Sequence, residues 1–177
     1  MKLYNQTKID DKVLSTILYR AAKAVGSVRT QNTVIKVTTS VWRMHGRVHR
    51  PFYMYYEKFL KGQPYSGDAG GSLVRSDGGY MFLSIPNPSG DQRDREALGF
   101  AEAIYELAAH EWRHVRDFQK GERYGDYNRN WKNRPHERRA ISSTKRAVAM
   151  VDKDERIQDA IIALGLDIER IRKEVMR

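Results

Sequence analysis

The strongest constraint on the fold is one long amphipathic segment, about 91–120. Its apolar residues recur at helical spacing in a single stripe: Ala97, Phe100, Ala101, Ile104, Leu107, Ala108, Val115 and Phe118. At about 100° per residue, Glu111 falls inside this stripe, about 20° from its centre, and Arg113 falls on the opposite, solvated side. A carboxylate on a buried face is costly unless it is paired or linked to a metal. The segment therefore predicts a helix with a chemical function on its buried face, ended by Gly121.

The chemistry is indicated by the H-E-x-x-H motif that His110, Glu111 and His114 form within this helix. Positions i and i+4 lie one above the other on a helix, so both imidazoles can bind one zinc ion. The intervening Glu111 can take a proton from a zinc-bound water. His110 and His114 are therefore predicted metal ligands, and Zn²⁺ is the predicted cofactor.

A zinc site needs a third protein ligand. The metzincin pattern fails, because Asp117 and Lys120 stand where it requires Gly and His. A second helix is predicted to begin at Pro135, with Glu137 on the same face as its apolar residues. Two helices that each carry a glutamate in the packing face can bring both carboxylates to one buried point.

H-E-x-x-H followed 23 residues later by Glu137, in an E-x-x-A context, resembles the gluzincin type of zinc metallopeptidase. It looks closest to small SprT-like and phage-encoded peptidases. The resemblance covers about 80–151 and implies a zincin-like fold that hydrolyses peptide bonds, with His110, His114 and Glu137 as ligands and Glu111 as general base. SprT-like proteins usually take a histidine as third ligand, and Arg113 stands at a position usually uncharged in the family.

Two alternatives for the third ligand stay open. His136 is adjacent to Glu137, and Asp117 lies about one turn beyond His114, where it could bind the metal or orient an imidazole. The oxyanion of a hydrolytic reaction also needs a donor. Its candidates come from the connector between the two ligand helices and are Tyr124, Tyr127, Arg134 and His136. Of these, Tyr127 and His136 are the catalytic residues that we predict beside Glu111.

The formal net charge is +10, and it is concentrated around the predicted site. Residues 111–146 hold 11 Lys or Arg against 5 Asp or Glu, with aromatic residues interleaved in the connector at 123–134. Basic surface attracts acidic polypeptides or nucleic acid. The resemblance implies a polypeptide substrate, and this charge favours an acidic one. Two interpretations of the basic connector stay open: its charges only solvate the surface, or they bind nucleic acid as a further partner. A non-catalytic zinc-stabilised structural or nucleic-acid-binding protein is the rival function.

The remaining elements predict a single α+β domain with a small mixed sheet and about four helices. A first helix at about 8–25 has Thr7 and Asp10 as a capping pair and Gly26 as its stop. Strands are predicted at 32–44, 52–59 and 80–85, with a glycine-rich loop at 63–79. In the resemblance, the strand at 80–85 is the sheet edge that pairs with substrate; an ordinary core strand is the alternative.

A C-terminal helix at about 153–176 carries apolar residues in a short heptad pattern. It is predicted to pack on its own domain, with a partner-binding arm as the alternative. The chain has no cysteine, no apolar run near 18 residues and no signal-peptide core at its start. A cytoplasmic protein without membrane contact is therefore expected, and the sequence leaves its oligomeric state open.

Overall fold

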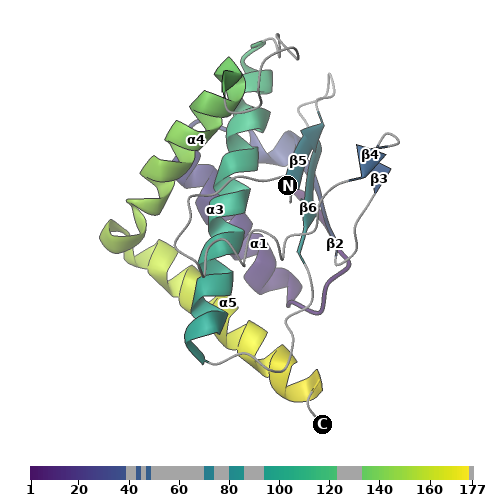
Figure 1. The fold of residues 1–177 in the computed structure, drawn as a ribbon, viewed down its shortest axis with the longest axis vertical. Coiled ribbons are helices and arrows are strands. Elements are labelled where there is room, and N and C mark those ends of the chain that lie inside the picture. Colours follow the sequence, from purple (N-terminus) through teal and green to yellow (C-terminus); the bar gives the residue numbers. More distant parts are fainter. Residues whose placement is uncertain are drawn as a thin grey trace.

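The computed structural model describes residues 1–38, 43–44, 47–48, 70–73, 80–85, 94–122 and 133–175. This part of the chain is α+β, as predicted, with four α-helices beside a small sheet (Figure 1). The α-helices are α1 (Asp11–Val25), α3 (Asp94–Gln119), α4 (Pro135–Val148) and α5 (Glu155–Val175). Two short 3₁₀ helices span Thr30–Asn32 and Val151–Lys153.

The sheet has four strands in the order β1 (Lys2–Asn5), β2 (Val34–Thr38), β6 (Tyr80–Ser84), β5 (Gly70–Leu73). The first three run parallel, and β5 runs antiparallel to β6. A separate two-stranded ladder joins β3 (Arg43–Met44) to β4 (Arg47–Val48). The sheet is thus mixed, as expected.

The structure corrects one prediction about the strands and decides between two alternatives for another. Residues Gly70–Leu73 were expected in a loop but form β5. The strand forms because the backbone of this segment pairs with β6. The strand predicted at 80–85 exists as β6 and lies between β2 and β5, so the core-strand alternative is confirmed and the edge is not. Among the described strands, the terminal strand next to β6 is β5. The strand predicted at 52–59 lies outside the described residues.

The boundaries of α1 follow from local chemistry. The Asp10 carboxylate accepts hydrogen bonds from the backbone N–H groups of Lys12 and Val13 at 2.9 and 3.0 Å, so Asp10 is the N-cap. Thr7 was predicted to start this helix, but its hydroxyl accepts from the Ile9 N–H in the turn before it. Gly26 ends α1 at φ +96°, where a side chain would be strained.

Helix α3 is the centre of the molecule and contacts α1, α4 and α5 (Figure 1). It ends as predicted at Gly121, whose φ is +76°. The Gly121 N–H donates to the Phe118 carbonyl and the Glu122 N–H to the Asp117 carbonyl, at 2.8 and 3.0 Å. This is the Schellman pattern of helix termination. A defined end matters here because the proposed site lies in the last three turns.

Trp112 ties α3 to α1. Its side chain is fully buried, and its indole N–H donates to the Leu18 carbonyl at 2.8 Å. Two helices are thereby fixed by packing and by a directional bond. Trp112 lies inside H-E-x-x-H, so the motif carries a structural anchor as well as its chemical residues.

Helix α5 packs against α1 and α3 with one apolar face. The buried residues of that face are Ile157, Ile161, Leu164, Ile168 and Ile171. No helix among the described residues is long and apolar enough to cross a membrane.

Trp112→Phe is expected to lower the free energy of unfolding by about 1–3 kcal/mol, because it leaves a void and removes the bond to Leu18. Urea denaturation measures this difference. Tyr19→Phe removes one polar group from a Tyr that is 39% exposed, and serves as the control with little expected effect. Equal stability of Trp112→Phe and the wild type would contradict this role.

Candidate metal centre

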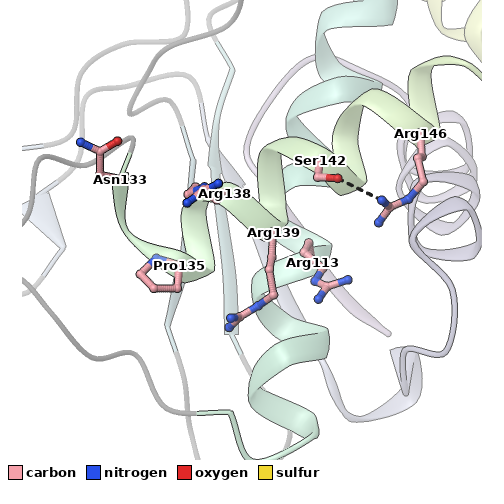
Figure 2. A pocket seen from close by; sticks show the side chains of 7 residues that line it. All are labelled: Arg113, Asn133, Pro135, Arg138, Arg139, Ser142 and Arg146. Atoms are coloured by element: carbon pink, nitrogen blue, oxygen red, sulfur yellow. Dashed lines mark hydrogen bonds between the residues drawn. The ribbon is translucent and has the colours of Figure 1, made fainter.

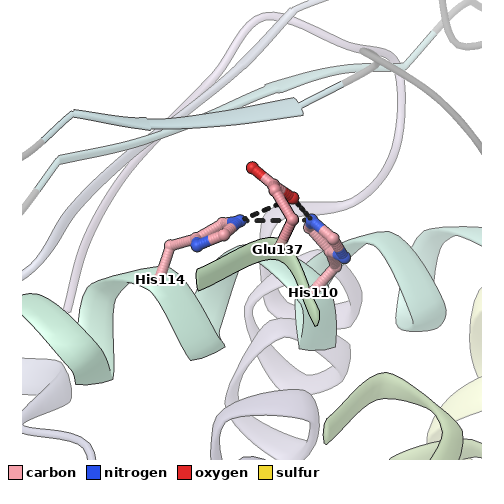
Figure 3. Close-up of side chains that lie close together, drawn as sticks. All are labelled: His110, His114 and Glu137. Carbon is pink, nitrogen blue, oxygen red and sulfur yellow. Dashed lines mark hydrogen bonds and ion pairs between the residues drawn. The ribbon is translucent and has the colours of Figure 1, made fainter. Parts of the chain in front are cut away.

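The predicted ligands come together where α4 packs on α3. His110 and His114 lie one turn apart on α3, and both are buried. Helix α4 begins with Pro135 at its first turn, as predicted, so Glu137 lies in that turn. There the positive end of the helix dipole favours a carboxylate. Glu137 is 8% exposed and faces the two imidazoles (Figure 3).

Three atoms of these side chains form a nearly equilateral triangle. The Nε2 atoms of His110 and His114 are 3.2 Å apart. Glu137 Oε2 lies 3.3 Å from the His110 nitrogen and 3.5 Å from the His114 nitrogen. Figure 3 shows all three converging on one point. In the described part of the chain, His110, His114 and Glu137 form a buried group that could hold a metal ion.

The triangle has the size of one face of a zinc coordination tetrahedron. With bonds of about 2.0–2.1 Å and tetrahedral angles, neighbouring ligand atoms are about 3.3–3.4 Å apart. The three measured separations lie within about 0.2 Å of that range. Facing imidazole nitrogens either share a proton or direct both lone pairs at a cation. The donor set and its dimensions therefore suit a metal ion with short bonds to nitrogen and oxygen, such as Zn²⁺.

The electrostatics of the group favour a cation. Burial alone would raise the pKa of Glu137, but the hydrogen bonds and charges of His110 and His114 outweigh it and hold that pKa well below its usual range. Burial alone would lower the pKa of His114, but Glu137, Glu111 and Asp117 together outweigh it and raise that pKa. Several carboxylates thus act on one buried point, and positive charge is stabilised there.

Glu111 is 4% exposed, in agreement with its predicted place in the buried stripe. Its carboxylate is close enough to His114 to raise the pKa of that imidazole. A buried carboxylate beside two imidazoles is what a general base for a bound water requires.

His136 lies beside the triangle without belonging to it. Its Nε2 is 3.4 Å from Glu137 Oε1, the oxygen that faces away from the other two histidines. Its ring centroid is 5.7 Å from that of His114. Burial lowers the pKa of His136, so the neutral ring can donate an N–H. Arg134, another donor candidate, directly precedes α4, while Tyr124 and Tyr127 lie outside the described residues.

Asp117 does not join the triangle, because its two oxygens are occupied by arginines. Arg139 Nε donates to Oδ2 at 2.8 Å, and Arg113 Nε lies 2.8 Å from Oδ1. The Asp117 side chain is 1% exposed. Arg113, predicted on the solvated side of α3, is half-buried instead, because this ion pair and the neighbouring α4 cover it.

Arg139 also contacts Glu122 at 2.7 Å, so one guanidinium joins α4 to the end of α3. We call Asp117, Arg113, Arg139 and Glu122 the ionic clamp. Sequence reasoning missed Arg139, since no periodicity predicts an ion pair between two helices. The sequence shows only that Arg139 lies two residues after Glu137 and therefore on a different face of α4.

Comparisons with protein-family models, with curated proteins and with solved structures gave no match. The function is therefore inferred from the geometry and chemistry of the site.

Asp117→Asn is expected to weaken zinc binding about tenfold, because Asn cannot hold both arginines and α4 would then present Glu137 less rigidly. The same change should lower the free energy of unfolding by about 1–3 kcal/mol. Competition with a chromophoric chelator gives the affinity, and urea denaturation with EDTA gives the stability of the metal-free protein.

Glu122→Gln is the matched control, since Glu122 contacts the same Arg139 but its side chain is 41% exposed. Glu122→Gln should change the metal affinity and the free energy of unfolding much less than Asp117→Asn does. Equal effects of both variants would show that burial of Asp117 is not what holds the helices together.

Proposed function

We propose that this chain is a zinc metallopeptidase with a zincin-like domain of the gluzincin type, related to small SprT-like or phage-encoded peptidases. His110, His114 and Glu137 are the metal ligands, and Glu111 is the general base. The observation that carries the proposal is the triangle of two imidazole nitrogens and one carboxylate oxygen, with sides of 3.2, 3.3 and 3.5 Å. The buried H-E-x-x-H glutamate beside it adds the group that hydrolysis needs.

Bound zinc would polarise the scissile carbonyl and lower the pKa of the attacking water. The Glu111 carboxylate accepts the proton of that water and delivers it to the leaving amine. His136, held near Glu137, can donate its ring N–H to the developing oxyanion. The burial of the three ligands keeps bulk water from competing for these interactions.

We place an extended substrate along β5. In the sheet as described, β5 is the terminal strand next to β6, and it packs against α3, the helix that carries the two histidines. A peptide can extend a sheet by pairing with such an edge. This replaces β6 as the predicted edge. The surplus of positive charge favours acidic segments in the bound polypeptide.

Protein purified without added metal is expected to contain one Zn²⁺ per chain by elemental analysis, and the His110→Ala/His114→Ala double variant to contain none. His136→Ala should keep its zinc, because His136 lies outside the triangle. Zinc-free wild type, or full zinc in the double variant, would contradict the metal site. Zinc loss in His136→Ala alone would make His136 a ligand.

Glu111→Gln is expected to keep zinc and to lower hydrolysis of an unfolded protein such as casein at least about 100-fold, because the proton acceptor is lost. Glu102→Gln, an exposed change two turns earlier on the same helix, is the control and should leave the rate unchanged.

The rival is a non-catalytic protein that uses zinc only for folding. Such a protein would unfold when chelated, and Glu111→Gln would change nothing measurable. Cleavage by Glu111→Gln at the wild-type rate would also remove the general-base role.

A further inference from the structure

A polar cavity is lined by residues at and before the start of α4, by α4 itself and by Arg113 of α3 (Figure 2). Its volume is about 480 Å³. It is lined by four arginines and three other residues: Arg113, Arg138, Arg139, Arg146, Asn133, Pro135 and Ser142. Among the described residues that line it, there is no carboxylate. We call it the arginine pocket.

Two of the four arginines carry charge that the described residues do not neutralise. Arg113 and Arg139 contact Asp117, and Arg139 also contacts Glu122. For Arg138 and Arg146, by contrast, the structure gives no carboxylate partner in the parts of the chain it describes. The Arg146 guanidinium donates to the Ser142 hydroxyl, at 3.0 Å. Both arginines are exposed.

The pocket faces away from the metal centre. Residues 138, 142 and 146 follow one another at i+4 spacing and form one stripe of α4. At about 100° per residue, the middle of this stripe is about 140° from Glu137. Glu137 is buried against α3, whereas Arg138, Ser142 and Arg146 are exposed. A ligand in the arginine pocket therefore need not touch the proposed metal ligands.

The spacing of the two uncompensated arginines favours an extended anion. Eight residues of α-helix separate their backbones by about 12 Å. Figure 2 shows Arg138 and Arg146 apart along the helix rather than converging on one point. With the two guanidinium groups apart as they lie in the structure, a single phosphate contacts one of them and not both. A nucleic acid strand carries one charge per about 3.4 Å of helix axis, so it presents several phosphates over the same length.

We propose that the arginine pocket binds the phosphodiester backbone of nucleic acid without reading its sequence. Guanidinium groups bind phosphate oxygens with two parallel N–H donors, and hydroxyl and amide side chains such as Ser142 and Asn133 are common further donors. An acidic polypeptide needs carboxylates at matching intervals, whereas every nucleotide supplies a charge. The net charge of +10 adds long-range attraction. The site does not depend on peptidase activity.

The test is fluorescence anisotropy with a labelled strand of about 20 nucleotides, single-stranded and duplex, between about 50 and 200 mM salt. Arg138→Ala/Arg146→Ala is expected to weaken binding about tenfold at low salt. Two lost phosphate contacts should also reduce the slope of log affinity against log salt by about 1.5. Both residues are exposed, and urea denaturation verifies that the variant is folded.

Arg156→Ala/Lys173→Ala is the matched control, because it removes two exposed charges from α5 and gives the same net charge. It should change affinity less than about twofold, since only the general attraction is reduced. Equal losses in both double variants, or no binding by the wild type at low salt, would overturn the pocket. Tighter binding of poly-glutamate than of DNA, lost with Arg138 and Arg146, would assign it to acidic polypeptides instead.

Discussion

The packing of α4 on α3 buries charged and polar groups, and burial of charge is tolerated only with compensation. Glu137, Glu111 and Asp117 are all below 9% exposed at this contact. Asp117 is compensated by arginines from both helices. Glu137 has two imidazoles, and the triangle that they form has the dimensions of a zinc site. The rest of the fold holds these two helices in register.

Features that depend on nearest neighbours could be predicted from the sequence. Gly26 and Gly121 end their helices because their φ values are positive, and Pro135 begins α4 because it lacks an N–H that would need a partner. The place of Glu111 in the buried stripe follows from helical periodicity alone. Two helices that each bury a glutamate predicted that Glu137 lies near Glu111, while its place beside the two histidines was implied by the resemblance to gluzincins.

Features set by tertiary structure could not be predicted. Strand order depends on which segments meet in space, so the sequence left β6 open between an edge and a core strand, and it lies inside the sheet. The four residues of β5 have low strand propensity, and their pairing with β6 decides their structure. Arg113 was expected in solvent because a helical wheel omits the second helix that covers it. For the same reason the sequence left Asp117 as a ligand candidate, because its partner Arg139 lies on the other helix.

The ionic clamp lies between the basic arginine pocket on one face of α4 and the metal centre on another. Arg113 and Arg139 line the arginine pocket, and they also hold Asp117, whose charge acts on His114. An anion that draws a guanidinium from Asp117 would change the free energy of binding a cation at the histidines. Thermodynamic linkage makes such an effect reciprocal: the cation would change the affinity for the anion by the same factor. The sharing of these two arginines thus provides a physical route for heterotropic coupling across the width of α4.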